Sequence, residues 1–335
     1  MHAFSPDPTS SGAPKLSLAA VVPATDDPPT LARCAAALQA GHRPPDTLIV
    51  QRTPAGAGPA AARNAGTSGL DADVVVFVDS DVEVHADALA RIERRFAEDP
   101  ALAALFGAYD DAPAAPDLTS RFRNLLHHHV HVSAPGEAET FWAGIGAVRR
   151  DAFEATGGFD AERFPEPSVE DIELGMRLRD RGAKLRLDPA IRGRHLKAWT
   201  PLGMVRTDLW RRGVPWVRLL LRGDRRRRSG ALNLGPRHRA SAAATLAIVL
   251  ATLARRPRLA SASLFAVLAL NRDLYALLAR RGGPRLLVGG IGLHLVHQLT
   301  AIASVPIAFV LHLKDLATSS PGWGERRRQG EGGPR

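Results

Sequence analysis

The sequence contains a single cysteine, Cys34, and few aromatic residues, which make up 5% of its 335 residues. One cysteine excludes an internal disulfide framework and a zinc site built from several thiolates, and it is typical of a reducing compartment. No collagen-like period, heptad array or repeat of 20–50 residues is present. Because 45% of the residues are hydrophobic, the chain can bury a full core, and wholesale disorder is excluded.

Charge of both signs is plentiful but unevenly placed. Residues 1–180 carry 15 Lys and Arg against 27 Asp and Glu, whereas residues 181–335 carry 29 against 7. This asymmetry indicates two parts that face different partners. A basic part suits either nucleic acid or the anionic leaflet of a membrane. Here the arginines flank apolar stretches and no nucleic-acid-binding module is recognisable, so we expect a membrane partner and no nucleic acid.

The acidic half alternates between short apolar runs and helical patterns. Residues 1–14 are rich in Pro and Ser and predict a disordered tail without the features of a secretory signal peptide. Residues 15–200 predict an α/β domain, a mostly parallel sheet flanked by helices. Strands are expected at Leu16–Val22, Thr47–Val50, Asp73–Val78, Ala101–Ala108 and Phe141–Val148. Helices are expected at Thr30–Ala40, Pro59–Ser68, His85–Glu98, Leu118–Val132 and Glu170–Arg181.

The basic half predicts a helical, membrane-associated region. Residues 201–239 form a basic amphipathic segment that suits the membrane interface, and residues 240–317 contain three apolar stretches: Ala240–Ala254, Leu259–Leu270 and Leu286–Leu311. Only the third reaches the ~20 residues that a spanning helix needs, so the number of spans stays open between one and three. Residues 318–335 are polar and predict a second disordered tail.

The run Arg225–Arg228 precedes these apolar stretches. Cytoplasmic loops of membrane proteins carry an excess of Lys and Arg. We therefore expect a protein of the cell membrane whose acidic domain lies in the cytoplasm.

Two carboxylates, Asp79 and Asp81, directly follow the most apolar strand, DVVVFV. The carboxyl end of a parallel strand is where open α/β sheets bind ligands. The two charges repel each other unless a cation compensates them, and Mg²⁺ or Mn²⁺ on a nucleotide diphosphate does so. A solvated turn is the alternative explanation for this short pattern.

Three other groups have both a chemical and a structural interpretation. Glu170 and Asp171 open a helix, where the helix dipole alone favours acidic residues. His195 follows a strand and suits either a metal ligand or a structural role. His127 and His131 lie one helical turn apart, as in some metal sites. Because no acidic third ligand lies near them in sequence, we expect a polar helix face beside the acceptor groove instead.

Taken together, these features resemble the family-2 glycosyltransferases. The resemblance covers roughly Leu16 to Lys197 and rests on five elements in order: Pro23 after the first strand, GPAAARNAG at Gly58–Gly66, VDSD at Val78–Asp81, GGFD at Gly157–Asp160, and Glu170-Asp171. It implies the GT-A fold, a nucleotide-diphosphate sugar as donor and a divalent metal, Mn²⁺ or Mg²⁺. Some members of this family also carry a membrane-embedded C-terminal region.

The resemblance also implies roles for individual residues. Those implied to bind the nucleotide are Pro23, Ala24, Asp26, Arg63, Asn64 and Asp79. The implied metal ligands are Asp81 and His195. Gly144, Gly158 and Phe159 are implied to shape the substrate site. Asp171, paired with Glu170, is implied to be the catalytic base.

Two departures from the family pattern qualify these roles. Gln51 stands where the family normally has an acidic residue after the second strand, which leaves the identity of the nucleotide open. The Gln-x-x-Arg-Trp signature of processive synthases is absent, since Trp210 is followed by Arg211 without the preceding residues. This favours addition of one sugar per encounter.

The resulting hypothesis is an inverting, metal-dependent transfer of a sugar to a hydroxyl acceptor, with a lipid-linked or cell-envelope acceptor suggested by the membrane region. A nucleotidyltransferase is one alternative, but it usually needs a Gly-rich loop after the first strand, and this loop reads PATDDPP. A catalytically silent, membrane-tethered protein that binds nucleotide sugars is the other alternative.

Overall fold

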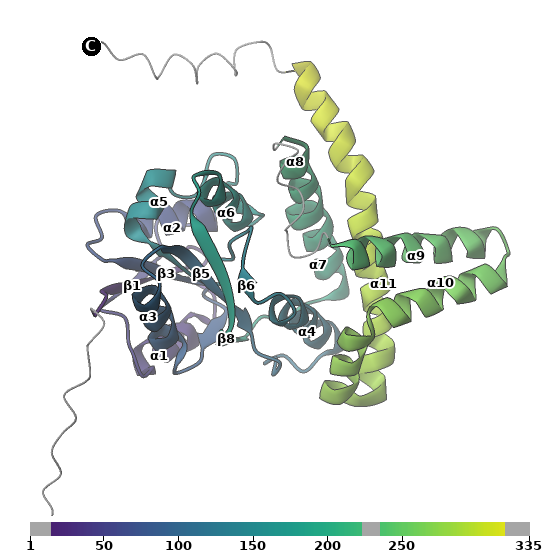
Figure 1. Cartoon of the computed structure of the whole chain (residues 1–335), viewed down its shortest axis with the longest axis horizontal. Helices are drawn as coiled ribbons and strands as arrows, with labels where there is room; N and C mark the ends of the chain where they lie inside the picture. Colours follow the sequence, from purple (N-terminus) through teal and green to yellow (C-terminus); the bar gives the residue numbers. More distant parts are fainter. Residues whose placement is uncertain (1–14, 223–234, 319–335) are drawn as a thin grey trace, which may run out of the picture.

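The computed structural model describes residues 15–222 and 235–318 (Figure 1). The predicted N-terminal tail and the run Arg225–Arg228 lie outside the described residues, and so does the predicted C-terminal tail beyond Thr318.

An eight-stranded sheet forms the centre of the N-terminal part, here called the sheet domain (residues 15–200). Its strands run in the order β2-β1-β3-β7-β5-β8-β4, and β6 pairs with β8. The bounds are β1 Leu18–Pro23, β2 Thr47–Gln51, β3 Val74–Val78, β4 Val82–Val84, β5 Leu102–Tyr109, β6 Gly136–Glu137, β7 Ile145–Arg149 and β8 Lys184–His195. Strand β1 is parallel to β2 and β3, and β5 is parallel to β8. Strand β7 runs antiparallel to β3 and β5, and β8 runs antiparallel to β4 and β6. The sheet is therefore mixed and not mostly parallel as expected.

Helices cover both faces of this sheet, which confirms the α/β architecture. They are α1 Leu31–Ala40, α2 Pro59–Thr67, α3 Ala88–Glu98, α4 Leu118–Val132, α5 Arg150–Thr156 and α6 Glu170–Asp180. Helices α1 and α3 pack on one face through Leu38, Ile92 and Phe96. Helices α5 and α6 pack on the other through Phe153 and Leu174. Full burial of each such side chain contributes about 1.5–3 kcal/mol.

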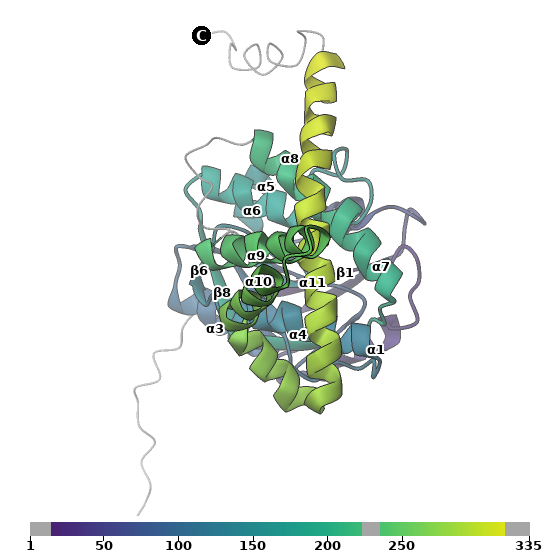
Figure 2. The same cartoon turned by 90° about the vertical axis from the view of Figure 1, so that its right-hand side faces the viewer.

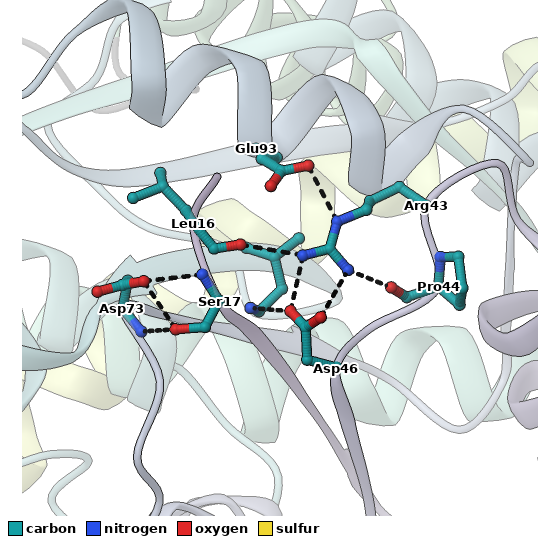
Figure 3. A network of polar contacts seen from close by, with 8 residues as sticks. Leu16, Ser17, Arg43, Pro44, Asp46, Asp73 and Glu93 are labelled. Atoms are coloured by element: carbon teal, nitrogen blue, oxygen red, sulfur yellow. Dashed lines mark hydrogen bonds and ion pairs between the residues drawn. The ribbon is translucent and has the colours of Figure 1, made fainter. Parts of the chain in front are cut away.

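A network of charged groups fixes the amino end of β1 (Figure 3). Arg43 donates to Glu93 on α3 over 2.9 Å and to Asp46 over 2.6 Å. Asp46 in turn accepts from the backbone amide of Leu18, and Asp73 accepts from that of Ser17. These contacts hold β1 in register with its neighbours at the edge opposite to Asp79.

Helices make up the rest of the described chain. Their bounds are α7 Pro201–Arg206, the π-helix η1 Thr207–Gly213, α8 Val214–Arg222, α9 Pro236–Leu253, α10 Pro257–Leu270 and α11 Arg272–Thr318. Helices α9 and α10 form a hairpin that projects from α11 (Figure 1). A core cluster that includes Phe122, Leu125 and Leu278 joins α11 to α4. Among the described residues, α11 is the one helix long and apolar enough to cross a membrane, judged by length and composition.

One expected boundary is wrong. The strand expected from Phe141 begins at Ile145, because Trp142 folds over Gly144. The apolar stretch Leu286–Leu311 lies within α11, which is kinked at a single non-helical residue, Gly283.

Candidate active site

Arg63 joins the two acidic motifs of the sheet domain. Its Nη2 donates to Oδ1 of Asp79 over 2.7 Å, and its Nη1 donates to Oε1 of Glu170 over 3.0 Å. The guanidinium is buried and lies over the ring of Phe159, 5.3 Å from its centroid. Arg63 thus brings together residues that follow β3 and open α6, and its charge offsets two carboxylates that would otherwise repel each other.

Asn64, the next residue on α2, holds the GGFD loop. Its Nδ2 donates to the carbonyl of Phe159 over 2.8 Å, and its Oδ1 accepts from the amide of Phe159 over 2.9 Å. Gly158 has φ +68°, and a Cβ added there would lie 2.7 Å from the Asn64 Oδ1. The loop therefore needs glycine at this position both for its backbone conformation and for the approach of Asn64.

Asp171 follows Glu170 on the first turn of α6. Its Oδ2 accepts from the amide of Ala143 over 3.2 Å, and its Oδ1 accepts from the amide of Ile172 over 2.8 Å. Burial, together with the neighbouring charge of Glu170, raises the pKa of Asp171 to about 7. A carboxyl with this pKa is suited to accept and release a proton near neutral pH.

Asp81 and His195 face each other across the edge where β4 pairs with β8. The Asp81 Oδ2 and the His195 Nε2 are 3.6 Å apart. Two atoms at this distance can both bind one metal ion through bonds of about 2.1 Å. No group of three or more His, Cys, Asp or Glu side chains fit to hold a metal occurs in residues 15–222 and 235–318. The pair therefore fits an ion whose remaining ligands come from water and substrate phosphate.

The remaining predicted substrate contacts lie on loops at the same edge of the sheet. Pro23 ends β1 beside Gln51, and the amide of Ala24 donates to the Gln51 carbonyl over 2.9 Å. Asp26 is exposed in the loop that follows. The carbonyl of Gly144 accepts from the amide of Asp79, so Gly144 lies directly against the acidic motif.

The sequence did not reveal an aromatic cluster behind His195. The Tyr109 ring stacks on His195 with centroids 4.2 Å apart and contacts Trp142 edge-on at 4.9 Å. His127 lies against both Tyr109 and Trp142. The rings fix the plane of the His195 imidazole. The aromatic pair Phe141-Trp142, which Ala143 separates from Gly144, was the available signal in the sequence.

The predicted polar face of α4 is wrong. His128 and His131 are buried, and their Nδ1 atoms pair with the carbonyls of Tyr109 and Gly107 on β5. Burial lowers the pKa of His131 to about 4, so it is neutral at pH 7. Because their polar atoms find partners on the sheet, these histidines can face the core.

The comparisons with known proteins agree with this geometry. The sequence model described as "Glycosyl transferase family 2" matches residues 21–157. The matched segment includes Arg63, Asn64, Asp79 and Asp81. Residues 21–157 are therefore similar to a family-2 glycosyltransferase domain. The match ends ahead of Glu170, so the second acidic motif and His195 lie beyond it.

Two curated proteins from two strains of Mycobacterium tuberculosis, each named Pre-mycofactocin glycosyltransferase, are 30% identical to this chain over 155 residues. The alignment covers 42% of this chain and 31% of the relatives, so the chain matches about a third of their length.

A solved mannosyltransferase from Pyrobaculum calidifontis, in complex with GDP-Man and Mn²⁺, superposes with a TM-score of 0.50 at 17% identity. The superposition covers 93% of this chain and 90% of the other, and it supports the predicted GT-A fold.

Proposed function

We propose that this protein is an inverting glycosyltransferase that moves a sugar from a nucleotide-diphosphate donor to a hydroxyl acceptor at a membrane. The observation that carries the proposal is the Arg63 bridge, which places the Asp79 motif and the Glu170-Asp171 pair at one edge of the sheet. Open α/β sheets bind their ligands at this edge. The relatives named for sugar transfer support the choice of reaction.

Asp171 is the proposed general base. It accepts the proton of the acceptor hydroxyl while that oxygen forms a bond to the anomeric carbon of the donor. The bond from this carbon to the phosphate oxygen breaks, and its electron pair leaves with the nucleotide diphosphate. Because attack and departure take place on opposite faces of the sugar in one step, the anomeric configuration inverts.

Asp81 and His195 are the residues that would hold a divalent metal, Mn²⁺ or Mg²⁺. When bound, such an ion supplies positive charge that stabilises the leaving diphosphate. Asp79 and Arg63 position the nucleotide side, and Asn64 fixes the loop of Gly158 and Phe159 on the substrate side. Gln51 donates to the carbonyl of Thr53 and so contacts its own loop, which leaves the choice of nucleotide open.

A cavity of about 460 Å³ supports an acceptor that approaches from the membrane side. It lies between α7, η1 and the loop before α6, and its lining includes Arg206, Trp210, Arg211 and Glu166. Glu166 lies in the loop that leads to Asp171. Two arginines beside a half-exposed Trp suit an acceptor that carries both an anionic group and an apolar part.

A donor screen tests the proposal. Membranes containing the full-length protein are supplied with a panel of nucleotide sugars and Mn²⁺ or Mg²⁺, and release of nucleotide diphosphate is measured. We expect turnover of at least one donor that stops when the ion is chelated. Release of pyrophosphate instead would indicate a nucleotidyltransferase, and binding without turnover of any donor would indicate a silent binding protein.

A further inference from the structure

Helix α11 has one exposed apolar side between Val288 and Leu316. Val288, Val305, Phe309 and Leu316 are each at least half exposed. The opposite side of the helix is buried against α4, η1 and α8. Figure 2 shows α11 running across the sheet domain, with the α9–α10 hairpin in front of it. The other side of the helix already packs against protein. An exposed apolar side of this length therefore indicates contact with a membrane or with another protein.

Polar contacts tie the first half of α11 to the sheet domain. Arg281, near the start of the helix, forms an ion pair with Asp111, which follows β5. In the middle, the His297 Nδ1 pairs with the Asp208 Oδ2 over 2.7 Å. Asp208 is itself buried and pairs with Arg123 of α4 over 2.6 Å. Two separate points of the helix are therefore held by charged groups of neighbouring elements.

A third tie holds the end of the helix. Asp315 pairs with both Arg218 and Arg222 of α8. Leu219 fixes α8 to the sheet domain. It packs against Phe164, in the loop before α6, and against Val169, the residue that precedes α6. The last turns of α11 are therefore held, through α8, on the same side as the sheet domain.

The spacing of these ties is shorter than a membrane is thick. Gly283 kinks α11 just after Arg281, so the continuous helix begins at Pro284. At 1.5 Å per residue, about 20 Å of helix separates Pro284 from His297, and about 27 Å separates His297 from Asp315. The hydrocarbon core of a bilayer is about 30 Å thick. Any stretch of α11 long enough to cross this core therefore includes at least one tie and its charged partner.

Crossing would place these charged groups and the elements that carry them in hydrocarbon, where charged side chains are strongly unfavourable. We propose that α11 does not cross the bilayer but lies in the plane of a membrane containing anionic lipids, with Val288, Val305, Phe309 and Leu316 in the lipid. Both of its ends then lie on the side of the sheet domain. The excess of Lys and Arg after residue 180 provides charge complementarity to this surface. The inference rests on the membrane association proposed above but not on sugar transfer.

Single-cysteine labelling tests this topology in the full chain. Cys34 is buried and its pKa is raised to about 12 by burial, so the wild type serves as the unlabelled control. Cysteine replaces Arg52, Arg280 or Lys314 in separate variants, at exposed positions in the sheet domain and near the two ends of α11. Sealed vesicles of each orientation are treated with a membrane-impermeant maleimide. We expect all three variants to label from the same side, and labelling of Arg280→Cys and Lys314→Cys from opposite sides would overturn the proposal.

A second measurement tests the lipid contact. Phe309→Asp with Leu316→Asp should reduce co-sedimentation with phosphatidylglycerol-containing vesicles at least tenfold, while circular dichroism remains that of the wild type. The matched control is Arg33→Asp with Arg52→Asp on the sheet domain. It makes the net charge more negative than the test variant does, and it should reduce co-sedimentation much less. A wild-type protein that forms dimers and does not sediment with vesicles would show that a second copy covers this side. The donor screen is scored separately, so failure of sugar transfer leaves these results interpretable.

Discussion

Arg63 and Glu170 are 107 residues apart in the chain, and their side chains meet at 3.0 Å. The second guanidinium nitrogen of Arg63 reaches Asp79 at the end of β3. A planar guanidinium can donate to two carboxylates at once, which an ammonium group on a flexible stem does less well. The acidic motifs of the site are therefore arranged by a buried cation from α2.

Replacement of this cation should weaken both folding and the site. In Arg63→Met, two carboxylates lose their partner, and we expect the free energy of unfolding to fall by about 3 kcal/mol. Arg63→Lys keeps the charge but not the double contact and should lie between Met and the wild type. Thermal unfolding of the three proteins checks this. A Met variant as stable as the wild type would show that Arg63 does not offset these charges.

Substitution of two adjacent glycines distinguishes the effect of backbone strain from that of the contact with Asn64. Both Gly157 and Gly158 have positive φ, but a Cβ on Gly157 meets nothing within 4 Å, whereas one on Gly158 would meet Asn64. Gly157→Ala should cost about 1–2 kcal/mol from the backbone alone. Gly158→Ala should cost more and should also lower kcat/KM. Equal losses of stability and activity in the two variants would contradict the role of Asn64 in holding the loop.

The raised pKa of Asp171 predicts a pH profile. Only the carboxylate form can accept a proton, so kcat/KM should rise about tenfold per pH unit below pH 7 and level off above it. Glu170 and Arg63 are the charged groups that face Asp171, and Arg63 opposes the increase in its pKa. Initial rates between pH 5 and 9 at saturating metal measure this. A profile that is flat from pH 5 to 7 would argue against Asp171 as the base.

The metal assignment predicts a specific loss of binding. Asp81→Ala should remove the dependence of nucleotide-diphosphate binding on Mn²⁺ and weaken that binding at least tenfold, because a carboxylate ligand is lost. Asp99→Asn is the matched control, since Asp99 pairs with Lys184 at the opposite edge of the sheet. Isothermal titration calorimetry with and without the ion measures both variants. Unchanged metal-dependent binding in Asp81→Ala would count against this ligand.

The charged network around β1 should affect stability without affecting chemistry. Arg43→Ala removes the guanidinium donor from Glu93 and from Asp46 (Figure 3), and we expect a loss of about 1–3 kcal/mol in the free energy of unfolding. The kcat measured below the unfolding transition should stay within twofold of wild type. A large drop in kcat at an unchanged melting temperature would show that Arg43 contributes to catalysis and not to stability.

The sequence predicted those parts of the fold that depend on local patterns. The apolar run before Asp79 and the helical period of Leu118–Val132 matched the structure to within a residue. Strand β4 was missed because three residues are too few for a periodic signal. The direction of β7 was also not predictable, since periodicity along one strand does not reveal the direction of its neighbour.

The site was predictable as a set of residues but not as an arrangement. The order of the motifs indicated Arg63, Asp79 and Glu170 separately. Nothing in the sequence paired them, because their contacts depend on how α2 and α6 pack on the sheet. The stack of Tyr109 on His195 was likewise hidden, since two distant strands, β5 and β8, create it by pairing.

The most direct test of sugar transfer is to compare the wild type with Asp171→Asn on the same donor. The account predicts that the variant folds and binds the nucleotide sugar with wild-type affinity while release of nucleotide diphosphate falls at least a thousandfold. A folded Asp171→Asn protein that transfers sugar at the wild-type rate would contradict it.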